Sequence, residues 1–274
     1  MGLHIIEIKK HGVCFVGDIH GNFESIKFLT TNTGLSGVTY VFVGDCGFGF
    51  NNDSYYANTF DKIRKSISKF DNEYIFIRGN HDSKEYFDNK KIKLKYFKTV
   101  PDYTVIKTPE HNILCVGGAT SIDRSYRINQ EKHNLLKYQI LHRCSEEDAR
   151  LKCPRLYWSD ELPYYDENAL NELKEKDINI YIVCTHTCPS FADPISKEGI
   201  KMWLKEDKTL EADIGLERNV MDRIYEKLKS DGHKIDKWIY GHYHRHNYEF
   251  IESTHFIMLD MCRNGICDTY PVLY

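Results

Sequence analysis

The sequence predicts an α/β protein with two β-sheets. Short apolar runs typical of buried strands alternate with segments whose apolar residues recur at helical spacing. Later apolar segments at 103–106, 113–116, 248–251 and 256–259 have the pattern of hairpin strands and require a second sheet. The 274 residues, of which 41% are hydrophobic and 28% charged, suit one large soluble domain spanning 1–274.

Five of the predicted strands end beside a side chain that can bind a metal ion. These strands and donors are Val13–Val16 with Asp18 and His20, Tyr40–Val43 with Asp45, Tyr74–Ile77 with Asn80 and His81, Ile180–Cys184 with His186, and Trp238–Tyr240 with His242 and His244. Ligands in open α/β sheets gather at the carboxyl ends of the strands. We therefore expect these donors to meet at one site.

Two amphipathic helices and one helix start are predicted between and after the strands. Phe60, Ile63, Ile67 and Phe70 share one helical face, and apolar residues between 220 and 228 share another. Asp166 is placed to cap a helix that begins next to it.

Residues 119–165 interrupt this alternation and are predicted to form an irregular lid over the site. Long irregular segments in compact domains are usually functional or mobile, and this one is rich in aromatic residues and arginine. A second loop, from Cys188 to about Leu216, is predicted to form the opposite wall. Trp203 in that segment offers a platform for a ring or base, although local core packing explains a tryptophan equally well.

Each donor taken alone has a simpler explanation. Gly44-Asp45 is an ordinary turn signal, and a lone His-x-His pair on a strand usually binds nothing. Five donor-bearing strand ends in one chain are harder to attribute to unrelated turns. Oxygen and imidazole donors together favour manganese, iron or zinc over calcium or magnesium.

In five blocks, GDIHGN, GDCG, GNHD, THTCP and GHYH, the sequence resembles the calcineurin-like metallophosphoesterases, with the blocks in family order over residues 17–244. The resemblance implies a four-layer α/β/β/α sandwich and two divalent metal ions, with Asp45 bridging them. One ion would be held by Asp18, His20, Asp45 and His244. The other would be held by Asp45, Asn80, His186 and His242.

Such a binuclear centre implies hydrolysis of a phosphoester by metal-activated hydroxide, with manganese the favoured metal and iron or zinc the alternatives. Catalytic roles are predicted for Asp45 and for His81, which follows the ligand Asn80 and can protonate the leaving oxygen or stabilise transition-state charge. The alternative for His81 is a hydrogen bond to nearby backbone.

The protein-phosphatase branch of the family carries a second aspartate and an arginine where this chain has Phe48 and Gly49. This departure puts protein serine/threonine phosphatase activity in doubt, although Arg78 matches the RGNH run of that branch. Residues 117–127 resemble a block that borders the active site in small bacterial and phage relatives. The predicted substrate-binding residues are therefore Arg127, Arg124, Asp123 and Arg78, and a solvated loop arginine is the alternative for Arg127.

Composition limits the binding partners and the cellular location that can be expected. A net charge of −3 gives no broad reason to expect nucleic-acid binding, and no apolar run is long enough to cross a membrane. The N-terminal residues lack a signal-peptide pattern, so a cytoplasmic location is expected. Nine cysteines without zinc-ribbon spacing, Cys262 and Cys267 among them, are expected to be free thiols.

The function predicted is that of a metal-dependent phosphoesterase acting on a phosphomonoester, a phosphodiester or a nucleotide. A nuclease of the same superfamily is the main alternative, although this chain has little room for an extra nucleic-acid-binding domain. A non-catalytic scaffold with this fold is a further alternative, weakened because no ligand of the five blocks is missing. The sequence says nothing about the oligomeric state.

Overall fold

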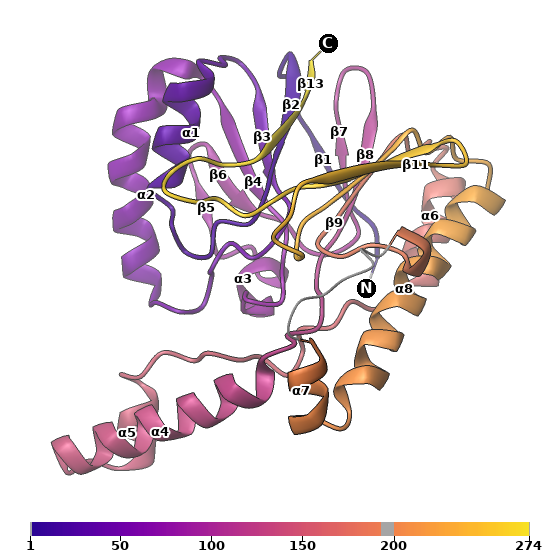
Figure 1. Cartoon of the computed structure of the whole chain (residues 1–274). Helices are drawn as coiled ribbons and strands as arrows, with labels where there is room; N and C mark the ends of the chain where they lie inside the picture. Colours follow the sequence, from indigo (N-terminus) through magenta and orange to yellow (C-terminus); the bar gives the residue numbers. More distant parts are fainter. Residues whose placement is uncertain (1, 193–199, 274) are drawn as a thin grey trace.

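Two mixed β-sheets lie face to face between two helical layers in the computed structural model, which describes residues 2–192 and 200–273 (Figure 1). Helices α1 and α2 cover the outer face of one sheet, and α6 and α8 cover the outer face of the other. The predicted four-layer α/β/β/α sandwich is confirmed.

The six-stranded sheet contains the first three donor-bearing strands side by side. In spatial order its strands are β13 (Thr269–Leu273), β2 (Gly12–Val16), β3 (Thr39–Phe42), β4 (Glu73–Phe76), β6 (Phe97–Thr99) and β5 (Lys93–Leu94). Strands β2, β3, β4 and β6 run parallel, so their carboxyl ends lie at the same edge. The edge strands β13 and β5 are antiparallel to their neighbours.

The seven-stranded sheet contains the other two donor-bearing strands. In spatial order its strands are β1 (His4–Glu7), β7 (Thr104–Lys107), β8 (Asn112–Val116), β9 (Ile182–Thr185), β10 (Lys237–Tyr240), β12 (Thr254–Met258) and β11 (Asn247–Ile251). The β7–β8 and β11–β12 pairs are the antiparallel hairpins that the sequence predicts. Strands β8, β9, β10 and β12 are parallel.

Helices connect the strands and extend beyond them. They are α1 (Ser25–Thr33), α2 (Asp53–Ile67), α3 (Lys84–Asp88), α4 (Arg124–His142), α5 (Glu146–Arg150), α6 (Glu167–Glu175), α7 (Ile200–Glu206) and α8 (Leu210–Ser230), with short 3-10 turns η1 (Ser68–Phe70) and η2 (Ser190–Ala192). The predicted cap of α6 is present, since the Asp166 side chain accepts a hydrogen bond from the Ala169 N–H. None of the described helices combines the length and apolarity needed to cross a membrane.

The central strands are apolar throughout because both of their faces are buried. In β2, Val13 and Phe15 point to the core between the two sheets, whereas Cys14 and Val16 pack in the layer of α1 and α2. The predicted helical faces pack the same way: Phe60 and its neighbours in α2 on the six-stranded sheet, and the apolar face of α8 on the seven-stranded sheet. The packing of α2 and α8 on the two sheets holds the strand ends, and thus the donors, in fixed positions.

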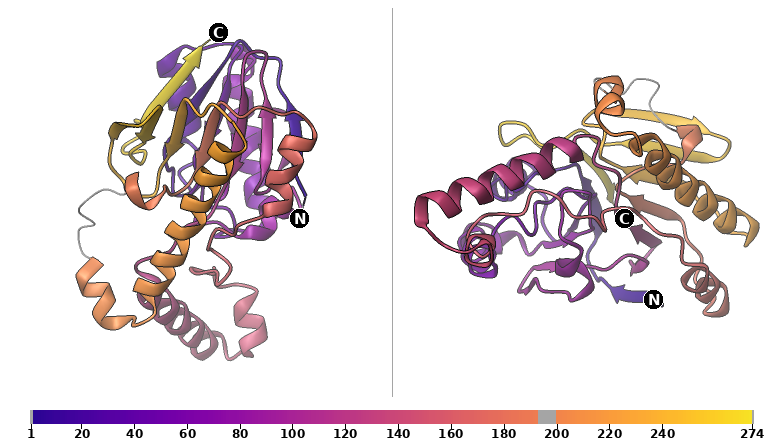
Figure 2. Two further views of the ribbon diagram at one scale, coloured as in Figure 1. Left: turned by 90° about the vertical axis from the view of Figure 1, so that its right-hand side faces the viewer. Right: turned by 90° about the horizontal axis from the view of Figure 1, so that it is seen from below.

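Residues 119–165 are largely helical, so the prediction of an irregular segment is wrong. Helix α4 and the short α5 pack on each other and project from one end of the sandwich (Figure 2). Most of α4 is polar and few of its residues are buried. It therefore lacks the stripe of apolar residues from which a helix can be predicted in a sequence.

The segment from Cys188 to about Leu216 is also largely helical where it is described, contrary to the prediction of a loop. It contains η2, α7 and the first turns of α8, while residues 193–199 lie outside the described part of the chain. Trp203 of α7 lies near Tyr126 of α4, with 6.4 Å between the ring centroids.

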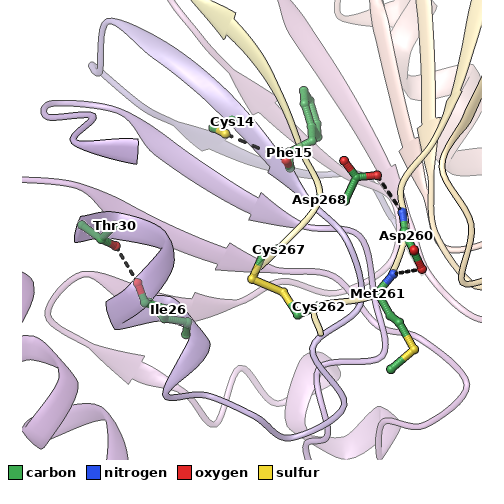
Figure 3. The surroundings of a disulfide bond; sticks show 9 residues. All are labelled: Cys14, Phe15, Ile26, Thr30, Asp260, Met261, Cys262, Cys267 and Asp268. Carbon is green, nitrogen blue, oxygen red and sulfur yellow. Dashed lines mark hydrogen bonds between the residues drawn. A yellow bond between two sulfur atoms is a disulfide. The ribbon is translucent and has the colours of Figure 1, made fainter. Parts of the chain in front are cut away.

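Cys262 and Cys267 form a disulfide bond near the C-terminal strand, so the prediction that all the cysteines are free is wrong for this pair (Figure 3). Between them, Asn264 and Gly265 have positive φ, and the flanking residues exchange backbone hydrogen bonds. An Asn-Gly pair favours this tight hairpin turn, which places the two cysteines opposite each other. Elsewhere in the described chain the cysteines are free, as predicted.

Candidate metal centre

The predicted metal ligands lie in the loops that follow five strands of the two sheets. Asp18 and His20 follow β2, and Asp45 follows β3. Asn80 comes after β4, while the remaining three ligands come after β9 and β10 of the other sheet. The two sheets therefore contribute donors to one site, as the strand-end argument predicts.

Four of these side chains form one compact cluster. The ligand atoms of Asp18, His20, Asp45 and His244 all lie within 4.8 Å of one another. Nε2 of His20 lies 2.9 Å from Nε2 of His244, and the latter lies 3.5 Å from Oδ2 of Asp18. These are the four residues that the family resemblance assigns to the first ion.

A second group of donors meets beside the first and shares Asp45 with it. Nε2 of His186 lies 3.0 Å from Oδ1 of Asn80 and 3.2 Å from Oδ1 of Asp45. The ring of His242 lies 5.1 Å from the ring of His186, centroid to centroid. Asp45 thus contacts both groups, which is the position a bridging carboxylate requires.

Four of the donors have a left-handed backbone, which non-glycine residues rarely adopt. The φ angles are 45° for His20, 46° for Asp45, 71° for His242 and 54° for His244. Backbone strain of this kind clusters at functional sites. The histidine pair lies in the loop that follows β10, because that strand ends at Tyr240.

The chemistry of the two buried carboxylates fits a divalent cation. Asp18 is fully buried, yet its Oδ1 has no hydrogen-bond partner, and an unpaired buried charge is costly. Histidine side chains lie within 4 Å of the carboxylates of both Asp18 and Asp45. A cation between the carboxylates would satisfy Oδ1 of Asp18, which the protein alone leaves without a donor.

The electrostatic state of the site also favours positive charge. Although burial opposes ionisation, the imidazoles of His81 and His186 hold the pKa of Asp45 well below its ordinary value. Burial likewise opposes protonation of His186, but Asp45 and Asp18 raise its pKa to about 9. The two carboxylates therefore stabilise positive charge at this position.

Residues 12–246 match the sequence model of a protein family described as calcineurin-like phosphoesterase. The match covers more than half of the chain. This chain belongs to the calcineurin-like phosphoesterase family. The resemblance found in the sequence is confirmed, whereas no protein of curated function matches the sequence significantly.

Solved structures similar to this phosphoesterase are distant from it. A dimetal phosphatase from Danio rerio is 15% identical with a TM-score of 0.43, and the match covers 94% of this chain and 87% of that one. A protein assigned as a 5′-nucleotidase from Staphylococcus aureus is 11% identical with a TM-score of 0.40, with 91% of this chain covered. The phosphoesterase spans 49% of the length of that chain. Likenesses this distant carry no information about its substrate.

Asp82 ties two ligand loops of the phosphoesterase together. Its carboxylate accepts hydrogen bonds from the backbone N–H groups of Cys46, Gly47 and Phe48 at 2.7–3.0 Å and from that of Gly79 at 2.9 Å. Four N–H groups thereby fix the loop of Asp45 against the loop of Asn80. The sequence prediction missed this role, although an acidic residue ending the GNHD block is a visible signal.

Gly241 is required because the carboxylate of Asp18 lies against its Cα. A Cβ at Gly241 would come 2.2 Å from Oδ1 of Asp18. We expect Gly241→Ala to displace that carboxylate and to weaken Mn²⁺ binding by at least about 10-fold, as loss of a ligand's support does. Isothermal titration calorimetry with Mn²⁺ measures the effect.

The matched control for this prediction is Gly215→Ala. Gly215 lies in α8 with no atom within 4 Å of an added Cβ, so alanine there should leave metal binding unchanged. The control should raise stability by about 0.5–1 kcal/mol, since glycine is unfavourable in a helix. Unchanged Mn²⁺ affinity in Gly241→Ala would contradict the placement of Asp18.

The donors open into a cavity of about 640 Å³ that also contains His81, Asp123 and Arg127. Nη2 of Arg127 lies 3.3 Å from Nε2 of His81, while Nε of Arg127 donates to the Asp123 carboxylate at 2.7 Å. Burial, with the neighbouring charge of Arg127, lowers the pKa of His81 to about 4 against the opposing effect of Asp45. Because a guanidinium can only donate, Nε2 of His81 accepts the hydrogen bond from Arg127.

Two arginines predicted to bind substrate lie elsewhere. Arg78 is 1% exposed and pairs with Asp102 at 2.9 Å, and it also donates to backbone carbonyls of residues 160–162. Arg124 pairs with Asp207 and Asp213. Neither lines the cavity, because long-range acidic partners that the sequence does not reveal hold both guanidinium groups.

Part of the cavity wall was missed by the sequence prediction. Arg245, Met261 and Arg263 line the cavity together with Tyr243. A hydrogen bond of 2.7 Å from the Cys262 N–H to the Asp18 carbonyl seats the disulfide-closed turn beside the metal ligands. The only sequence signal was the adjacency of Arg245 to the histidine pair.

Proposed function

We propose that this phosphoesterase hydrolyses a phosphomonoester, a phosphodiester or a nucleotide with two divalent metal ions, manganese before iron or zinc. The observation that carries the proposal is the pair of donor groups that share Asp45 and open into one cavity. The first ion would be held by Asp18, His20, Asp45 and His244, and the second by Asp45, Asn80, His186 and His242. When bound, the ions supply positive charge for the phosphoryl group and make water a better nucleophile.

Arg127 and His81 act on the substrate from the cavity wall. The Arg127 guanidinium is held at Nε by Asp123, so its Nη atoms can turn to two phosphate oxygens. This turn releases Nε2 of His81, and the negative phosphate favours its protonation. His81 then donates that proton to the leaving oxygen.

The insert at residues 119–165 contributes through its base. Its cavity-lining residues are Ser121, Ile122, Asp123 and Arg127, at or before the first turn of α4. We treat it as an accessory part of a single domain, 1–274, with the projecting end of α4 and α5 away from the reacting atoms. A cytoplasmic location stays a prediction.

The proposal predicts that Mn²⁺-loaded enzyme hydrolyses p-nitrophenyl phosphate, bis(p-nitrophenyl) phosphate or both, and that a chelator abolishes the activity. Release of p-nitrophenolate at 405 nm in about 1 mM Mn²⁺, well above typical transition-metal affinities, measures the rate. Oligonucleotides in the same screen test the nuclease alternative, which predicts cleavage of these alone. Loaded enzyme that leaves every ester intact would count against catalysis and favour the scaffold alternative.

A further inference from the structure

A buried chain of hydrogen bonds links the carboxylate of Glu161 to the ligand Asn80. Oε2 of Glu161 accepts a hydrogen bond from the Ser121 hydroxyl at 2.6 Å, and Oε1 accepts one from the Ser121 N–H at 2.9 Å. The Ser121 oxygen in turn accepts one from Nδ2 of Asn80 at 2.9 Å. All three residues are at most 2% exposed, so water does not compete for these bonds.

The direction of this chain follows from the donors and acceptors available. Oε1 of Glu161 takes the Ser121 N–H and Oε2 takes the Ser121 hydroxyl, so the one proton of that hydroxyl is committed to Glu161. The serine oxygen then has only lone pairs left to offer, and these face the N–H₂ group of Asn80. The amide oxygen of Asn80 must therefore point the other way, toward Nε2 of His186 and the second donor group.

The orientation of this amide matters because its two ends differ in charge. The oxygen of Asn80 attracts a cation, whereas the N–H₂ group repels one. The two ends have almost the same shape, so packing alone does not select between them. A hydrogen-bond partner on one side is needed to select the metal-binding orientation.

We propose that Glu161 is a positioning residue that, through Ser121, holds the Asn80 amide oxygen toward the second metal ion. This inference rests on the proposed function, because it takes Asn80 as a ligand of that ion. Glu161 touches neither the ions nor the substrate and acts on the site only through Ser121.

The backbone of Glu161 is anchored from the ligand loop itself. Nη1 of Arg78 donates to the carbonyl of Glu161 at 2.8 Å, and the Ala119 N–H donates to the same carbonyl at 3.2 Å. Since Arg78 lies two positions before Asn80, one loop fixes both the ligand and its support. Burial raises the pKa of Glu161 to about 8, and the hydrogen bonds that it accepts from the Ser121 hydroxyl and N–H oppose this shift.

Titration with Mn²⁺, followed by the electron paramagnetic resonance signal of the free ion, tests the proposal without using turnover. We expect wild-type protein to bind two ions, and Ser121→Ala to weaken the second by about 10- to 100-fold, as loss of ligand support does. Ser125→Ala, whose hydroxyl lies near Asp207 instead, is the matched control and should change neither affinity.

Glu161→Gln tests the direction of the hydrogen bonds between Glu161, Ser121 and Asn80, because the new side chain keeps the shape of the old one. The Ser121 N–H can only donate, so the new amide places its oxygen there and turns its N–H₂ group to the serine oxygen. The serine proton is then no longer committed, both orientations of Asn80 become allowed, and the second Mn²⁺ should bind at least several-fold more weakly. Thermal unfolding of the apo-proteins shows whether either variant has lost its fold.

Repeating the Ser121→Ala substitution in a second variant distinguishes positioning of Asn80 from a general structural role of Ser121. In Asn80→Asp, the two carboxylate oxygens are equivalent, so no orientation remains to be selected. Ser121→Ala should therefore cost much less Mn²⁺ affinity in that background than in the wild type. Equal losses in both backgrounds would overturn the proposal, as would a second-site affinity unchanged by Ser121→Ala. Wild-type protein that binds fewer than two ions would overturn the proposed function as well.

Discussion

Replacing Asp45 with asparagine is expected to reduce turnover by more than 100-fold and to release bound metal. The support of a ligand is already worth about 10- to 100-fold in affinity or activity, and Asp45 contacts both donor groups directly. Asparagine keeps the shape but removes the negative charge that two cations would share. Hydrolysis of p-nitrophenyl phosphate and the metal content by mass spectrometry report the two effects separately.

Asp61→Asn is the control for this prediction. Asp61 is a half-exposed carboxylate of α2 that pairs with Arg64 and Lys65, far from the donors in the fold. The Asp61→Asn enzyme should retain its full metal content and its rate of p-nitrophenyl phosphate hydrolysis. An Asp45→Asn enzyme that keeps two ions and at least half of its rate would refute the bridging assignment.

Replacing Arg78 with methionine is expected to lower the free energy of unfolding by about 3–5 kcal/mol, the usual cost of removing one partner of a buried ion pair. The change leaves the Asp102 carboxylate buried without its cation and removes the donors to the carbonyls of residues 160–162. The midpoint and slope of urea unfolding, measured on the apo-protein, give the loss.

Two comparisons make this second prediction specific. Lys65→Met breaks an exposed pair and should cost less than about 1 kcal/mol. Arg78→Met combined with Asp102→Leu should be less destabilising than Arg78→Met alone, because no unpaired charge remains. If Arg78 bound substrate as the sequence suggested, its loss would raise KM and leave stability unchanged.

The sequence predicted the layers and the ligand positions because both follow from local patterns. Strands buried on two faces must be apolar throughout, and their ends at one sheet edge bring distant donors together. Asp18, Asp45 and Asn80 could therefore be placed together from their strands alone. Strands β1 and β13 escaped notice because they lie at sheet edges, where β1 alternates in exposure and β13 contains Pro271.

The roles of the arginines could not be predicted because they depend on partners distant in sequence. Arg78, Arg124 and Arg127 look alike as residues, but Asp102 and Asp207 hold the first two in ion pairs. Asp123, four positions before Arg127, leaves that guanidinium in the cavity. A sequence shows which charges exist, whereas the fold decides which of them are already neutralised.

The pairing of β13 with β2 has a consequence for how the protein folds. Residues 269–273 hydrogen-bond to residues 12–16, so two strands more than 250 positions apart in the sequence must meet to complete this sheet. Contacts this far apart along the chain make folding slow, because loop closure costs entropy before any contact forms. Until β13 arrives, the ligand loop after β2 lacks the neighbour that its backbone pairs with. The loop that carries Asp18 is therefore fixed only late in folding, after this long-range pairing has formed.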